Sequence, residues 1–160
     1  INLLFLIEQG LLDIPVLYLS RYIIEHKTGY YQNLLNVTRH QQWETWMLYM
    51  LDAIEQTAIW TREKITAIHQ LMEQTAGFIR EQLPSIYSRE LVELLFVQPY
   101  CRIGNMVDAN IAKRQTASRY LKALCQIGVL QEIKSGREKL FVHPKLIRLL
   151  TLDGNHIGNY

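Results

Sequence analysis

The chain has 160 residues, of which 49% are hydrophobic and 20% are charged. This apolar content is enough for a packed core and excludes an intrinsically disordered protein. The formal net charge of +2 conceals an asymmetry: residues 1–83 carry 6 basic and 9 acidic side chains, whereas residues 84–150 carry 11 basic and 5 acidic ones. We therefore expect two units and consider a polyanion as a partner for the second.

The cysteine content and the first residues bear on location. Cys101 and Cys125 cannot build a disulfide framework, and their number fits a reducing compartment. The apolar residues 1–19 are interrupted by Glu8 and Asp13, which is too broken for a membrane span. No signal-peptide pattern opens the chain. We expect a cytoplasmic protein that does not interact with membranes.

The first 83 residues show helical periodicity alone, without the alternation of strands. Five helices are predicted, over residues 2–12, 17–26, 28–36, 41–59 and 61–83. The first is apolar on every side and is expected at the centre of a core. Such a helix at the start of a chain without Met predicts a piece of a longer protein; the alternatives are removal of a tag, or an oligomer such as a homodimer that covers the helix. Thr28-Gly29 is expected to break the helices on either side, and Thr61 to cap the fifth.

The second half mixes short helices with strands. The predicted helices cover residues 88–97, 106–112, 114–127 and 145–150, and the predicted strands cover residues 100–103, 129–133 and 139–143. Asn105 is expected to cap the second of these helices, and Gly128 to end the third in a left-handed conformation. The fold class is therefore mainly α: a helical bundle at 1–83, a winged helix-turn-helix with a small β-hairpin at 84–150, and a flexible tail at 151–160.

The helix predicted from Arg114 has the composition of a DNA recognition helix. A core stripe of Ala117, Leu121 and Leu124 leaves basic and amide side chains on the other faces. Such side chains contact base edges and phosphates. The candidate DNA-binding residues are Arg114, Gln115, Thr116, Ser118, Arg119 and Lys122 on the helix, with Lys134, Arg137 and Lys139 on the hairpin. The alternatives are a solvated face and a module that docks a protein.

A second pattern lies in the first half. Residues 11–24, Leu-Leu-Asp-Ile-Pro-Val-Leu-Tyr-Leu-Ser-Arg-Tyr-Ile-Ile, resemble the segment that follows the signature motif of bacterial Fic-family proteins. The resemblance continues through Tyr30-Tyr31, Leu34-Leu35, Trp43, Trp46 and Glu55-Gln56-Thr57-Ala58. Many proteins of that family also end in a winged helix, which residues 84–150 resemble. The likeness thus covers nearly the whole chain in order.

The resemblance implies a parent protein that transfers AMP from ATP, with Mg²⁺, to a hydroxyl of a target protein. The family motif, His-Pro-Phe-x-Asp/Glu-Gly-Asn-Gly-Arg, supplies a general base, a metal ligand and a phosphate-binding turn. It does not occur in this chain. We therefore expect the chain alone to be inactive and to hold no cofactor, with the motif upstream of Ile1. Its partners would be the missing N-terminal Fic helices and the target protein.

Nucleotide contacts are the remaining expectation from the resemblance. Tyr30 and Tyr31 fall where the family approaches the adenine, and an aromatic face can pack on a purine; core or rim packing is the alternative. No His stands at metal-ligand spacing, so no metal site is expected. The competing hypothesis for the whole chain is a DNA-binding transcriptional regulator whose helical half dimerises or senses a ligand.

Overall fold

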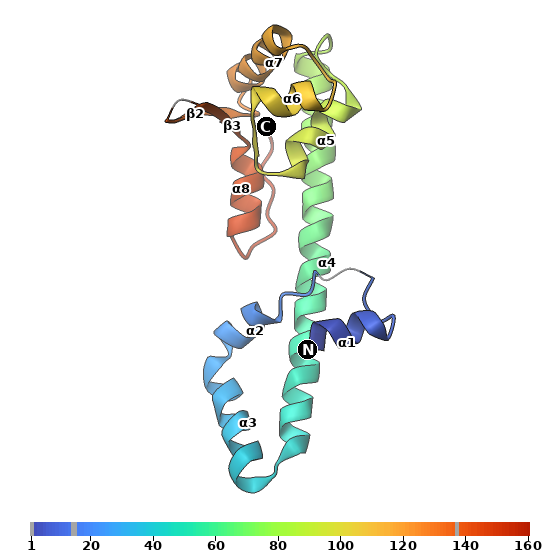
Figure 1. Cartoon of the computed structure of the whole chain (residues 1–160), viewed down its shortest axis with the longest axis vertical. Coiled ribbons are helices and arrows are strands. Elements are labelled where there is room, and N and C mark those ends of the chain that lie inside the picture. Colours follow the sequence, from blue (N-terminus) through green and yellow to red (C-terminus); the bar gives the residue numbers. More distant parts are fainter. Residues whose placement is uncertain (1, 14–15, 137) are drawn as a thin grey trace. The chain divides into compact units, whose positions relative to one another are not determined.

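A computed structural model describes residues 2–13, 16–136 and 138–160. The fold is mainly helical with a small antiparallel sheet, as the sequence predicts (Figure 1). The helices are α1 (Asn2–Glu8), α2 (Leu19–Glu25), α3 (Lys27–His40), α4 (Trp43–Gln82), α5 (Arg89–Val97), α6 (Ile103–Asp108), α7 (Arg114–Gln126) and α8 (Pro144–Thr151). The strands are β1 (Tyr100–Cys101), β2 (Gln131–Ser135) and β3 (Glu138–Val142).

Packing divides the chain into two compact units, Ile1–Glu63 and Lys64–Tyr160. This division falls inside α4, whereas the sequence places the domain boundary after residue 83. The difference arises because the second half of α4 contributes side chains such as Ile79 to the core of the second unit. None of the described helices is long and apolar enough to cross a membrane.

In the first unit, α1 does not have the buried position expected for it. The helix ends just before Gly10, which has a φ of +65° that suits glycine. However, Leu4 and Phe5 are 70% and 55% exposed. The expectation of a buried central helix is therefore wrong for this chain, because the other described residues leave more than half of each of these side chains uncovered.

The break between α2 and α3 lies at His26, not at Thr28-Gly29 as predicted. His26 leaves the helical region with a φ of −113° and a ψ of 34°. Gly29 lies inside α3, where a β-carbon would stand 3.6 Å from the ring of Tyr49. This distance is an ordinary van der Waals contact, so Gly29 neither interrupts the helix nor is required by its packing on α4.

The two helices predicted over residues 41–59 and 61–83 form one continuous helix, α4. The predicted cap at Thr61 is wrong, since this residue lies in the helix interior. α4 contains no proline, and its one glycine is Gly77, so nothing in its sequence forces an end before Pro84. A threonine can cap a helix but does not by itself start one.

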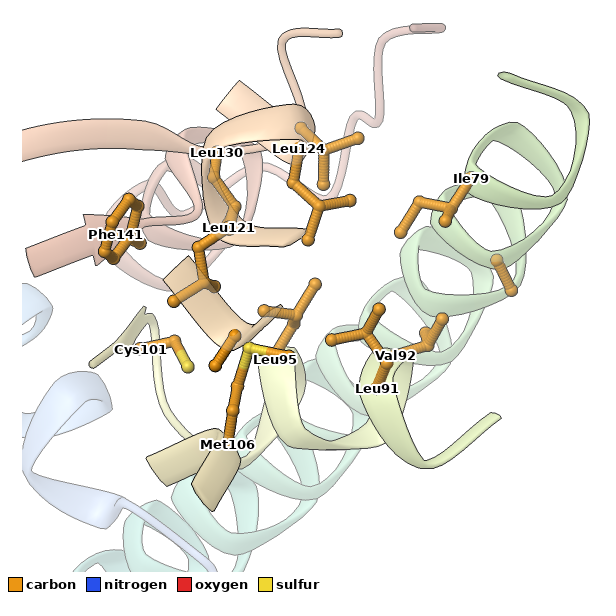
Figure 2. Close-up of a cluster of buried hydrophobic side chains, with 13 residues drawn as sticks. Ile79, Leu91, Val92, Leu95, Cys101, Met106, Leu121, Leu124, Leu130 and Phe141 are labelled. Atoms are coloured by element: carbon orange, nitrogen blue, oxygen red, sulfur yellow. The ribbon is translucent and has the colours of Figure 1, made fainter. Parts of the chain in front are cut away.

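The main core of the second unit is built from α4, α5, α6 and α7 with the strands β1 and β3. α5 begins at Ser88, whose hydroxyl accepts a hydrogen bond from the backbone N–H of Leu91 at 3.1 Å, as an N-cap does. Figure 2 shows the apolar side chains that meet at the centre. They are Ile79 of α4, Leu91, Val92 and Leu95 of α5, Cys101 of β1, Met106 of α6, Leu121 and Leu124 of α7, Leu130, and Phe141 of β3.

α6 begins earlier than the sequence predicts. Asn105 does not cap it; Arg102 holds the cap position, and the side-chain oxygen of Asn105 accepts a hydrogen bond from the Arg102 backbone N–H at 2.7 Å. α7 follows after a short turn and ends before Gly128, whose φ of +78° confirms the predicted left-handed stop.

The sheet has the strand order β1-β3-β2, and every pair is antiparallel. Tyr100 lies opposite Val142, and Lys134 lies opposite Lys139. The β2–β3 hairpin projects from the helices of this unit (Figure 1). It confirms the predicted hairpin, with β2 beginning two residues later than expected.

α8 and the segment after it pack on α4. Leu146 and Leu149 of α8 form a buried cluster with Ala67 and Leu71 of α4. The buried ammonium of Lys64 donates hydrogen bonds to the backbone oxygens of Leu149 at 2.9 Å and Leu152 at 2.8 Å. These carbonyls belong to the end of α8, where no intrahelical N–H reaches them.

Residues 152–160, for which the sequence predicts a frayed end, make specific contacts. The ring of Tyr160 stacks on Phe78 with the centroids 4.7 Å apart, and the Lys145 ammonium lies 3.4 Å from the Tyr160 centroid. The Tyr160 hydroxyl lies 2.6 Å from that of Thr75 and 3.3 Å from Nε2 of His143. This tail therefore contributes to the packing of the second unit.

His143 gives this packing a pH dependence. The buried ring is the N-cap of α8, with Nδ1 accepting a hydrogen bond from the Leu146 N–H at 3.2 Å. Burial lowers the pKa of His143 from 6.5 to about 4, helped by the positive charge of Lys145. The unfolded chain takes up a proton below pH 6.5 and the folded chain does not, so stability declines as the pH falls from 6.5 towards 4.

We predict that His143→Asn reduces this decline. Asparagine keeps a capping acceptor but does not titrate. Between pH 7 and pH 4.5, the unfolding free energy of the unsubstituted protein should fall by about 2–3 kcal/mol more than that of the variant. Urea unfolding at the two pH values measures the difference. Equal losses in both proteins would show that His143 does not cause the decline.

Candidate functional site

The outward face of α7 carries most of the predicted DNA-binding residues. Ala117, Leu121 and Leu124 are fully buried, which fixes the rotation of the helix about its axis. The predicted residues therefore lie on the remaining faces. Arg114, Gln115, Arg119 and Lys122 are exposed, whereas Thr116 and Ser118 are half-buried.

The cations of this face are available to a ligand. The guanidinium of Arg119 lies 5.8 Å from the ring centroid of its neighbour Tyr120. No carboxylate among the described residues pairs with Arg114, Arg119 or Lys122. α7 itself contains no acidic residue. The helix thus presents uncompensated positive charge to solvent.

The hairpin contributes less charge than its sequence suggests. Lys134 and Lys139 face each other across β2 and β3, and opposed like charges are unfavourable. Glu132 relieves this, because its carboxylate lies 2.5 Å from the Lys139 ammonium. Arg137, the third predicted hairpin residue, lies outside the described residues. Lys139 is therefore already paired, whereas Lys134 is exposed.

A hollow of about 540 Å³ brings two predicted residues together with one that sequence reasoning missed. Arg114 of α7 and Lys139 of β3 line it with Arg102, which directly precedes α6. The Arg102 guanidinium lies 5.3 Å from the ring centroid of Tyr100. Nothing in the spacing of these three cations indicates proximity, since the β1–β3 pairing and the α6–α7 turn bring them together.

The tyrosines predicted to contact a nucleotide lie in an aromatic cluster of the first unit. The ring of Tyr30 makes edge contacts with Tyr31 at 5.4 Å and with Trp46 at 5.3 Å between centroids. Tyr30 is half-buried and Tyr31 is 58% exposed. Neither residue lines the hollow that Arg21 and Asp52 border in this unit. The structure thus brings the two rings together.

A separate hollow of about 370 Å³ lies between α2 and the part of α4 in the first unit. The Arg21 guanidinium stacks over Trp60, 4.6 Å from its centroid. The Tyr22 hydroxyl donates a hydrogen bond to the Asp52 carboxylate. This bond, and burial as a second cause, raise the pKa of Tyr22 to about 12. The sequence analysis did not single out Asp52, and no motif marks it.

Metal chemistry finds no support in the described part of the chain, where no three His, Cys, Asp or Glu side chains gather as ligands would. The buried Cys101 has no disulfide partner, and burial raises the pKa of its thiol to about 11. Its thiolate is therefore scarce at neutral pH. This cysteine packs as a small apolar core residue.

We predict that Asp52→Asn lowers the pKa of Tyr22, because the amide oxygen is a weaker acceptor and carries no charge. A spectrophotometric titration at alkaline pH should then show one more of the nine tyrosines ionising near pH 10. Asp108→Asn, which lies in the second unit, is the control and should leave the titration unchanged. An unaltered curve for Asp52→Asn would contradict the assignment.

Comparison with known families relates the second unit to one family. Residues 71–146 match the model of the C-terminal domain of SoFic-like protein adenylyltransferases. The matched segment begins within the second half of α4 and reaches the first turn of α8, so it contains the core of the second unit. It covers just under half of the chain and includes both α7 and the hairpin.

Proposed function

We propose that this chain is the C-terminal portion of a Fic-family protein adenylyltransferase, and that its second unit is a winged helix that binds duplex DNA. The match of residues 71–146 to the SoFic-like C-terminal domain carries the first part. The exposed basic face of α7 carries the second. A cytoplasmic location accords with both parts and with the two free cysteines.

The first unit supports the enzyme assignment through its sequence and its surface. Residues 11–24 resemble the segment that follows the Fic signature motif. Large apolar side chains of this unit are exposed, among them Trp43, Met47 and Leu51, one helical turn apart on α4. Exposed apolar areas of this kind commonly mark surfaces that pack against other structure. In the whole protein, further Fic helices would cover them.

AMP transfer would require residues outside this chain. The signature motif supplies the base, the Mg²⁺ ligand and the phosphate turn, and the chain lacks it. The chain would contribute at most an aromatic face for the adenine, through the exposed ring of Tyr31 supported by Tyr30. ATP and Mg²⁺ are therefore proposed as ligands of the whole protein only.

The test of the enzyme assignment compares two proteins: this chain alone, and this chain with the residues encoded upstream of Ile1. Each is incubated with Mg²⁺ and ATP labelled on the α-phosphate. We expect label on a protein hydroxyl with the longer protein and none with the shorter one. A longer protein without the motif and without transfer would favour the alternative, a DNA-binding regulator whose first unit dimerises.

The order of elements supports the winged helix. α5, β1, α6, α7 and the β2–β3 hairpin follow one another as the parts of that fold do, with α7 in the place of the recognition helix. A recognition helix enters the major groove with its N-terminal residues towards the bases. Arg114 and Gln115 lie in that first turn.

Each exposed residue then has a chemical role. Arginine can pair with both acceptors of a guanine, and glutamine with an adenine. Lys122, two turns further along α7, would contact a phosphate. The hairpin would reach the backbone or the minor groove through Lys134, Lys139 and Arg137. The half-buried Thr116 and Ser118 would donate to phosphates that approach closely.

We predict that Arg114→Ala and Arg119→Ala each weaken binding to the preferred duplex by about 1–3 kcal/mol, because each removes a contact to a base. Arg148→Ala removes an exposed charge from α8 and serves as the control. Fluorescence anisotropy with a duplex selected from a random pool measures the affinities. Equal affinities for all four proteins would instead favour a winged helix that docks a protein.

A further inference from the structure

We infer that the hollow between α6, the start of α7 and β3 binds one backbone phosphate of duplex DNA; we call this site the phosphate seat. This inference rests on the proposed DNA binding and assigns a site within it. The seat includes Arg102, which the proposed recognition surface of α7 and the hairpin does not contain. It would fix where the protein stands along the duplex, because phosphate contacts set position whereas base contacts set sequence.

Three elements of the fold converge on the hollow. Arg102 precedes α6, Arg114 begins α7, and Lys139 lies near the start of β3. Asn105 adds a neutral donor. Its side-chain oxygen accepts a hydrogen bond from the Arg102 backbone N–H, which leaves the amide nitrogen Nδ2 of Asn105 with no hydrogen-bond partner in the described part of the chain. Two guanidinium groups, an ammonium and an amide suit the oxygens of a phosphate.

The charge around the hollow fits a phosphodiester. Asp108 also lines the hollow, and Glu132 pairs with Lys139. The three cations outnumber the two carboxylates among the described side chains, which favours an anion such as a backbone phosphate.

The position of the hollow agrees with the proposed docking. It adjoins Arg114 in the first turn of α7, the end of the helix that points towards the bases. The phosphates that border the major groove run past that end. A phosphate held by Arg102 would therefore limit how far α7 can slide or rotate in the groove.

Gly104 offers a test that leaves the fold intact. It lines the hollow, it does not have a positive φ, and a β-carbon there would meet no atom within 4 Å. Gly104→Glu places a carboxylate at the hollow, whereas Gly104→Gln adds the same bulk without charge. An acidic residue in the first turn of a helix is favourable, so the glutamate should not destabilise α6.

The measurement is duplex affinity by fluorescence anisotropy over a range of salt concentrations, with urea unfolding of each variant. Gly104→Gln should bind within about twofold of the unsubstituted protein, because it adds no charge. Gly104→Glu should bind about tenfold more weakly at 0.1 M salt, with a salt dependence shallower by about one charge. Both variants should unfold at similar urea concentrations.

The outcomes separate this inference from the proposed function. Equal binding by all three proteins would overturn the phosphate seat and leave DNA binding standing. Absence of duplex binding by the unsubstituted protein would overturn both. If Gly104→Glu unfolds more easily, Arg102→Gln is compared with the control Arg148→Gln instead. A slope of log affinity against log salt that is reduced by about one charge in Arg102→Gln alone supports the seat, and an unchanged slope overturns it.

Discussion

The buried stripe of α7 is the constraint on which the second unit depends. Ala117, Leu121 and Leu124 have no exposed surface and belong to one cluster with side chains of α4, α5, α6, β1 and β3 (Figure 2). Close-packed cores do not tolerate rotation of one helix without opening cavities. The stripe therefore decides which residues face water. The basic face of α7 and the hollow beside Arg114 both follow from it.

α4 explains why the two packed units do not coincide with the domains expected from the sequence at residues 1–83 and 84–150. Its second half supplies Ala76 and Ile79 to one buried cluster and Ala67 and Leu71 to another. A domain that began after residue 83 would lack these side chains. The family match begins at residue 71, within the same stretch of α4. The packing of the second unit thus depends on a helix that continues into the first unit.

The sequence predicted correctly those helix ends that depend only on neighbouring residues. Ser88 and Gly128 mark helix ends that the structure confirms, since a cap or a left-handed turn needs only neighbouring residues. The predicted cap at Thr61 was wrong, because a residue that can cap a helix is also tolerated inside one. The packing of Tyr160 and the position of Arg102 beside Arg114 depend on contacts between residues far apart in the sequence. No periodicity or spacing could have predicted either.

The most direct test of the DNA-binding account is a map of contacts by NMR, following backbone amide shifts of the chain as duplex DNA is added. The account predicts changes concentrated at residues 102–105, 114–122 and 134–139, reversed by high salt because phosphate contacts release counterions. It predicts little change in the exposed apolar part of α4, residues 43–51. Changes confined to α4, or none at all, would contradict the assignment of the second unit as a DNA-binding module.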